Sequence, residues 1–169
     1  MKITGRELSL EALDGLSELA RIEALCVFIR QDERPLKGAA GWVDWRMCGK
    51  LSQVLLDGFF EGRCLETLLL PSDGMLQSPR LFAFGCGPTA ELTSARLGEC
   101  LEHAGRTLQR AGLKSVATEL PAVPTMSEEA RVSSFNEHFG KTFSGEAVWV
   151  LAERAVTRLL PAQLPAPGR

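Results

Sequence analysis

Short apolar runs alternate along the chain with longer segments in which apolar residues recur at helical spacing. The first pattern is typical of strands covered on both faces, and the second is typical of helices with one buried stripe. Strands are expected at residues 1–8, 23–30, 65–71, 80–84, 114–120 and 147–152. The alternation predicts an α/β fold in which helices flank a mixed, mostly parallel sheet in three layers.

The segment 40–57 is expected to form one helix. Met47, Leu51 and Leu55 recur every four positions and would form its buried stripe. Gly58 follows the segment and can adopt the left-handed conformation that ends many helices.

The strongest helical pattern covers residues 93–111. Thr93 is its expected N-cap, and Gly112 is its expected C-terminal glycine. A further helix is expected after Ser127, whereas residues 9–23 read as a weak helix or a loop.

The length of 169 residues predicts a single domain. We expect residues 1–160 to form that domain and residues 161–169 to be a frayed, proline-rich tail. The initial methionine and the proline-rich end favour a complete small protein over a fragment.

The charge balance limits the classes of partner. The net charge is −2 and the pI is about 5.8, so the chain has no overall basic excess for binding nucleic acid. No run approaches the roughly 18 apolar residues of a membrane helix, and no secretory signal opens the chain. These features predict a cytoplasmic protein.

Five cysteines are spaced widely: Cys26, Cys48, Cys64, Cys86 and Cys100. They contain no Cys-x-x-Cys pair, so they do not form a zinc signature. Reduced thiols are expected, with Cys26 and Cys100 buried as small apolar residues. We expect neither a metal nor another cofactor.

The stretch RLFAFGCGP ends an apolar strand in Gly85, Cys86 and Gly87. With Ala90, the spacing fits Gly-x-Gly-x-x-Ala, a motif that can hold phosphate at the start of a helix. Pro88 lacks a backbone donor, however, and the strong helical pattern begins only near Thr93. We therefore favour a structural turn over a ligand-binding turn.

Residues for catalysis are few. His103 and His138 are the only histidines, and neither lies near a motif serine or cysteine in the sequence. Glu128 and Glu129 read as charges that favour a helix start. Cys86 could be a reactive thiol if a helix start lowered its pKa, but no activating base is evident.

Taken together, several segments between residues 24 and 120 resemble the amino-terminal domain of M17 leucyl aminopeptidases. These segments are ALCVFI, PLKGAA, GKLSQVLLDGFFEG, LETLLLP, LFAFGCGP, ELTSARLGECLEHAGRTLQRAG and KSVATEL. They follow the order and lengths of the elements in that family.

The resemblance implies a macro-domain-like sandwich and no peptidase activity. In these aminopeptidases the two metal ions and the catalytic arginine belong to a carboxy-terminal domain, whose signature is Asn-Thr-Asp-Ala-Glu-Gly-Arg. No position of this chain matches that signature. The resemblance therefore carries over no catalytic residue and no metal ligand.

Two functions remain open. The accessory domain contributes to hexamers in full-length relatives, so a protein-interaction or assembly module is the first hypothesis, with itself or another protein as partner. Trp42, Trp45, Phe59 and Phe60 would form the interface if they are exposed, although packing in the core is the simpler explanation. The alternative is a macro-like binder of a nucleotide or an ADP-ribose-type molecule at Gly85–Gly87.

Overall fold

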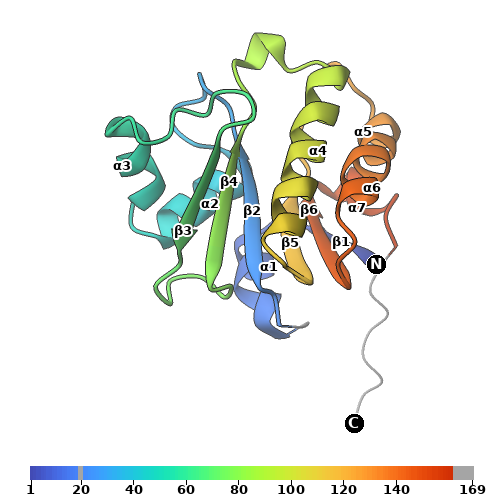
Figure 1. Cartoon of the computed structure of the whole chain (residues 1–169), viewed down its shortest axis with the longest axis horizontal. Coiled ribbons are helices and arrows are strands. Elements are labelled where there is room, and N and C mark those ends of the chain that lie inside the picture. The colour runs from blue at the N-terminus through green and yellow to red at the C-terminus, as the bar shows by residue number, and fades with distance from the viewer. Residues whose placement is uncertain (19–20, 162–169) are drawn as a thin grey trace.

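The computed structural model of the chain describes residues 1–18 and 21–161. A six-stranded sheet runs through the molecule in the order β1-β6-β5-β2-β4-β3 (Figure 1). Its strands are β1 (Lys2–Glu7), β2 (Ala24–Ile29), β3 (Thr67–Pro71), β4 (Arg80–Gly85), β5 (Ser115–Glu119) and β6 (Ala147–Ala152). All six expected strands are present, with bounds that differ from the expected ones by at most two residues.

Neighbouring strands are parallel except for the outermost strand β3. Four adjacent pairs run parallel, and β3 alone pairs antiparallel, with β4. The expected mixed, mostly parallel sheet is confirmed. Because β2, β4, β5 and β6 run in the same direction, their carboxyl ends all lie along the same edge of the sheet.

Helices cover both faces of the sheet (Figure 1). One layer contains α1 (Leu10–Asp14), α2 (Gly38–Arg46) and α3 (Lys50–Leu56). The other layer contains α4 (Ser94–Arg110), α5 (Glu128–Ser134), α6 (Gly140–Thr142) and α7 (Arg154–Thr157), and a π-helical turn at Phe135–Phe139 joins α5 to α6. Short 3-10 turns lie at Gly15–Glu18 and Thr89–Glu91.

Strand β2 shows how one run of apolar residues serves both layers. Ala24, Cys26 and Phe28 pack with α4, whereas the alternate residues Leu25, Val27 and Ile29 pack with α2 and α3. All six residues are buried. The two-residue period of a strand therefore divides ALCVFI between two hydrophobic clusters, which explains its lack of polar positions.

The expectation of one helix over residues 40–57 is wrong, because the chain forms two helices there. Cys48 and Gly49 have positive φ angles of 54° and 83°, which end α2 before α3 begins. The Asp44 side chain of α2 accepts hydrogen bonds from the Ser52 amide at 2.9 Å and from the Ser52 hydroxyl at 2.6 Å. The apolar stripe runs on through the break, so its spacing alone did not reveal the turn.

The expected helix caps are confirmed. The Thr93 hydroxyl accepts a hydrogen bond from the Arg96 amide, and the Ser127 hydroxyl accepts one from the Ala130 amide. Gly112 has a φ of +70° just after α4. The expected frayed tail covers residues 161–169, of which residues 162–169 lie outside the described residues. Within the described part of the chain, no helix is long and apolar enough to cross a membrane.

Candidate functional site

The carboxyl ends of β2, β4 and β5 surround a cavity of about 230 Å³. Phe28, Arg30, Lys37, Cys86 and Glu119 are among the residues that line it. Parallel sheets commonly bind ligands at this edge, so the cavity is the natural place to look for a small-molecule site.

The glycine turn after β4 has no amide left for a phosphate. Its three N–H groups all donate to backbone oxygens: Gly85 to Glu66 at 2.8 Å, Cys86 to Ile29 at 2.9 Å and Gly87 to Gly62 at 2.9 Å. An anion cradle needs N–H groups that point at the ligand without internal partners. The amides of the Gly85–Gly87 turn therefore hold neighbouring segments of the chain and not a ligand.

Close packing explains the first glycine of this turn. A Cβ atom on Gly85 would lie 1.9 Å from the carbonyl oxygen of Arg63, which is a steric clash. Gly87 has a φ of +74°, a conformation that other residues rarely adopt. Chain geometry accounts for both glycines without a ligand.

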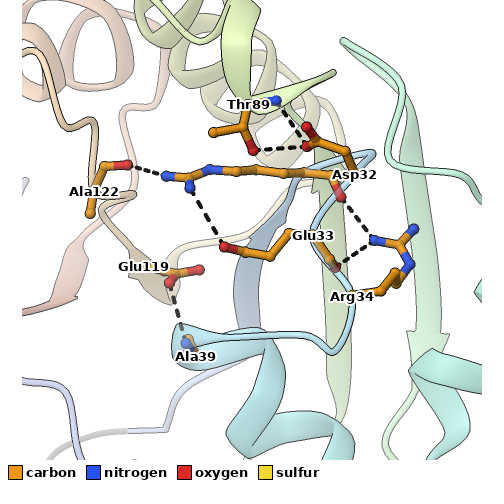
Figure 2. Close-up of polar contacts among 8 residues, drawn as sticks. Asp32, Glu33, Arg34, Ala39, Thr89, Glu119 and Ala122 are labelled. Atoms are coloured by element: carbon orange, nitrogen blue, oxygen red, sulfur yellow. Dashed lines mark hydrogen bonds and ion pairs between the residues drawn. The ribbon is translucent and has the colours of Figure 1, made fainter.

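The carboxylate of Glu119, the last residue of β5, lies at the start of α2 (Figure 2). Its Oε1 accepts a hydrogen bond from the Ala39 amide at 3.2 Å, and its Oε2 accepts one from the Phe28 amide at 3.2 Å. Removal from water raises the pKa of Glu119 to about 7, although these two hydrogen bonds act in the opposite direction. An internal carboxylate thus takes the position that an anionic ligand would take at the start of a helix, and it can exchange a proton near neutral pH.

Two polar links close the same edge of the sheet (Figure 2). Arg30 donates to the carbonyl oxygen of Ala122 and pairs with Glu33 at 3.5 Å. Asp32 accepts hydrogen bonds from the amide and the hydroxyl of Thr89, at 2.9 and 2.8 Å. These contacts join the segments that follow β2, β4 and β5.

The sequence interpretation did not select Glu119 or Arg30. Glu119 ends the apolar strand within KSVATEL, and Arg30 directly follows ALCVFI. The sequence did contain a signal for both residues, since each is a single charge at the end of an apolar strand. Such a group needs partners once it is partly buried.

The two histidines have structural contacts. His103 Nε2 lies 2.7 Å from the Thr67 hydroxyl, and its ring stands edge-on to Phe84. His138 lies 4.0 Å from Glu102, and its ring lies against Gly98. Within residues 1–18 and 21–161, no group of three or more His, Cys, Asp or Glu side chains could hold a metal ion.

Cys86 differs from the reactive thiol that one hypothesis required. Its side chain is buried, and a hydrogen bond with Cys100 together with burial raises the pKa of its thiol well above the usual value. The hypothesis of a lowered pKa at Cys86 is therefore wrong, and Cys86 does not have the character of a catalytic nucleophile.

The four aromatic residues singled out as an interface fall into two groups. Trp42, Trp45 and Phe59 are exposed by 44%, 63% and 82%, whereas Phe60 is 1% exposed and belongs to the core beneath α2 and α3. Burial removes Phe60 from any surface that a partner could contact.

Trp42 and Trp45 border an apolar groove along α2, which we call the tryptophan groove. It has a volume of about 530 Å³, and Leu10, Leu36 and Gly41 complete its lining. The guanidinium of Arg46 lies 5.0 Å from the centre of the Trp45 ring. This arrangement keeps two indole rings at the surface on one face of one helix.

The sequence profile of the cytosol aminopeptidase family, N-terminal domain, matches residues 24–140. The chain belongs to the cytosol aminopeptidase family. A probable cytosol aminopeptidase from Halorhodospira halophila (strain DSM 244 / SL1) is 30% identical over 111 residues, which are 65% of this chain and 22% of that protein. The matched part of the chain thus spans about a fifth of the length of that protein.

Solved structures of a leucine aminopeptidase and of macrodomains share the fold. A mutant tomato leucine aminopeptidase aligns with a TM-score of 0.62 and 14% identity, over 90% of this chain and 32% of that one. The macrodomain of Mycobacterium tuberculosis DarG aligns with a TM-score of 0.65 and 16% identity, over 89% and 98%. An Oceanobacillus iheyensis macrodomain with ADP aligns with a TM-score of 0.59 and 14% identity, over 82% and 80%.

These matches confirm the family and the macro-domain-like fold inferred from the sequence. The family profile that matches describes only the N-terminal domain of the aminopeptidase. The match therefore assigns no peptidase residue to this chain, and any other activity must be argued from its own site.

Proposed function

We propose that this chain is a non-catalytic assembly module of the cytosol aminopeptidase family, which associates through the tryptophan groove with a second copy of itself. We further infer that residues 1–160 act as one domain and that the protein works in the cytoplasm. The observation that carries the proposal is the pair of exposed indole rings on α2.

The groove has the composition of an interface core. Trp42 and Trp45 expose 44% and 63% of their surface next to Leu10 and Leu36. Tryptophan is enriched at the centres of protein interfaces, where burial of its large ring contributes most to affinity. Covering two indoles on one helix face would remove a contiguous apolar area from water.

A second copy is the occupant that the charges favour. The net charge is only −2, so two copies repel each other weakly. Lys37 and Asp44 lie at the margins of this surface and carry opposite charges. A two-fold contact places the same surface on both partners, and a margin with both signs is compatible with such self-pairing.

The oligomeric state of the purified chain tests this proposal. We expect light scattering and sedimentation to show a dimer whose population rises from micromolar to sub-millimolar concentration. Replacing both tryptophans (Trp42→Ser with Trp45→Ser) is expected to give a monomer. The matched control is Leu159→Ser, which removes an exposed apolar side chain next to α7 in the opposite helix layer and should leave the dimer intact.

A strict monomer at every concentration would overturn the proposal. Association only with an intact aminopeptidase would also overturn it, because the occupant would then be a different protein. Tryptophan emission is a second readout, since indole burial on association shifts it toward shorter wavelength.

A second candidate function is the binding of an ADP-ribose-type molecule at the carboxyl edge of the sheet. It is supported by the cations Arg30 and Lys37 in the edge cavity and by structurally similar proteins that were solved with ADP or with ADP-ribose. The cavity volume of 230 Å³ lies below the roughly 300–1,000 Å³ of typical ligand pockets, and the turn amides are already bonded. We therefore favour the assembly module.

Calorimetric titration with ADP-ribose decides between the two candidates. No heat at millimolar ligand is the expected result. Saturable binding that Arg30→Gln abolishes and Arg34→Gln preserves would establish the binder instead, since Arg30 lines the cavity whereas Arg34 donates to the neighbouring backbone of Arg30 and Glu61.

A further inference from the structure

Three cysteines from separate parts of the sequence meet on the α4 side of the sheet. Cys64 lies before β3, Cys86 follows β4, and Cys100 lies within α4. Cys86 and Cys100 belong to the core, and Cys64 is half-buried against it. The Cys100 sulfur lies 3.8 Å from the carbonyl oxygen of Gly85. The same oxygen accepts a hydrogen bond at 3.1 Å from the amide of Leu65, the residue directly after Cys64. Cys64 and Cys100 therefore adjoin one carbonyl group, and we call the three cysteines the thiol cluster.

A positive charge adjoins the outer thiol of the cluster. The Arg96 guanidinium lies 3.1 Å from the sulfur of Cys64 and also donates to Glu99 at 2.8 Å. Arg96 and Cys100 are four residues apart, on the same side of α4. A cation at this distance favours the thiolate form of Cys64, which is the form that oxidants attack.

The protons in the cluster are distributed unequally. Hydrogen bonding from Cys86, with a smaller effect from Cys64, lowers the pKa of the Cys100 thiol. Partial removal from water raises the pKa of Cys64, although Arg96 opposes that change. Cys64 is thus the partly exposed thiol, whereas Cys100 is the buried thiol with the lowered pKa.

We propose that Cys64 and Cys100 are a reversible oxidation site that closes to a disulfide when the protein meets a hydroperoxide. In the first step the Cys64 sulfur attacks one peroxide oxygen and the O–O bond breaks. Cys64 becomes a sulfenic acid, and the released hydroxide takes up the thiol proton to form water. In the second step the Cys100 sulfur attacks the Cys64 sulfur and expels the hydroxyl group, which leaves as water with the Cys100 proton. Two thiols and one hydrogen peroxide thus give one disulfide and two waters.

The remaining cysteines lie outside this chemistry. Cys48 is exposed in the turn between α2 and α3, which cover the other face of the sheet. Cys26 is buried in β2, and burial raises its pKa far above the usual value. Cys48 therefore serves as an internal control for an exposed thiol without a partner thiol at hand.

The test is oxidation of the reduced full chain with hydrogen peroxide, followed by alkylation and peptide mass spectrometry. We expect a monomer about 2 Da lighter, a peptide pair joined through Cys64 and Cys100, and full reversal by dithiothreitol. Oxidation of Cys48 before the cluster, a Cys86–Cys100 bridge, or no internal disulfide would each overturn the proposal.

Variants separate the two steps. In Cys100→Ser the second step is blocked, so dimedone is expected to capture a sulfenic acid on Cys64; wild-type protein should give little adduct. Arg96→Gln is expected to slow disulfide formation several-fold, whereas Arg106→Gln removes the same charge from an exposed ion pair on α4 and should not. Equal rates in the two arginine variants, or dimedone capture on Cys48 alone, would contradict the assignment. The tryptophan groove takes no part in these measurements.

Discussion

The Glu119 carboxylate accepts a hydrogen bond from the backbone N–H of Ala39 at 3.2 Å, which joins the end of β5 to the first turn of α2. The other carboxylate oxygen accepts from the Phe28 amide in β2. One side chain therefore connects two strands and a helix across the edge where a ligand would enter. A Cβ atom on Gly38 would lie 2.5 Å from Glu119 Oε1, so the close approach depends on glycine at that position.

This contact makes stability depend on pH. The pKa of Glu119 is raised from 4.5 to about 7 by removal from water, so the folded protein keeps a proton that the unfolded chain has already released. The contribution of Glu119 to the free energy of unfolding should therefore be fully present below about pH 4.5. It should be lost as the pH rises to about 7, by at most about 3 kcal/mol. Urea unfolding between pH 5 and 7.5 measures the slope.

The Glu119→Gln variant isolates that slope, because glutamine does not titrate. We expect the difference in stability between wild type and variant to change across this pH range. The charge of Glu33 contributes to the raised pKa of Glu119, so Glu33→Gln should reduce the slope only in part. His103, whose pKa is lowered mainly by removal from water, contributes the opposite slope and cancels in the comparison of wild type with Glu119→Gln. A difference between these two proteins that stays constant from pH 5 to 7.5 would contradict the assignment.

Gly85 should be among the least replaceable residues of the chain. An added methyl group would meet the Arg63 carbonyl oxygen, so Gly85→Ala must move the segment before β3 and is expected to cost more than about 3 kcal/mol. Gly112→Ala is the comparison: its Cβ would have open space, and only its φ of +70° opposes the change, at about 1 kcal/mol. Similar losses in thermal unfolding for the two variants would contradict this explanation.

Arg131 is a buried cation that anchors α5 to the sheet. It is 3% exposed, donates to the carbonyl oxygens of Leu120 and Pro121 at 3.0 Å, and pairs with Glu153. Arg131→Met would leave both carbonyls and the carboxylate unpaired, and we expect a loss of about 2–4 kcal/mol in chemical denaturation. Glu153→Gln keeps a hydrogen-bond acceptor for Arg131 and should lose only about 1 kcal/mol, so an equal loss in both variants would argue against the carbonyl contacts.

Truncation of two adjacent phenylalanines should change stability by very different amounts. Phe60 is 1% exposed, and Phe60→Ala is expected to destabilise the fold by about 3–5 kcal/mol through the cavity it leaves. Phe59 is 82% exposed, so Phe59→Ala should change stability by no more than about 0.5 kcal/mol. Thermal melts of the two variants at low concentration, where self-association is negligible, provide the comparison.

The hydrophobic pattern predicted most of the fold because strand and helix periods respond directly to burial. ALCVFI has no polar position because both of its faces are covered, and Thr93 and Gly112 mark α4 through local hydrogen bonding and backbone freedom. The break at Cys48 and Gly49 was not predicted, because the apolar stripe continues from α2 into α3 and conceals a turn in the backbone.

The candidate sites were harder to predict, since they depend on contacts between residues far apart in the sequence. Glu119 meets Ala39 across 80 positions, and Cys64 meets Arg96 of α4 across two intervening strands and a 3-10 turn. The sequence also placed Phe59 and Phe60 together, although neighbouring side chains at the end of a helix point in different directions. Which of the two faces solvent was decided by the packing of α3 against the sheet.

The hydrogen bonds of the Gly85–Gly87 turn also constrain how this edge of the molecule could diverge. Each N–H in the turn is held by the backbone of another segment, and a side-chain replacement does not release a backbone partner. A phosphate-binding descendant would need insertions or deletions that rebuild the 62–66 stretch. Point mutation alone would more readily remodel the surface of α2, where side chains determine the contacts.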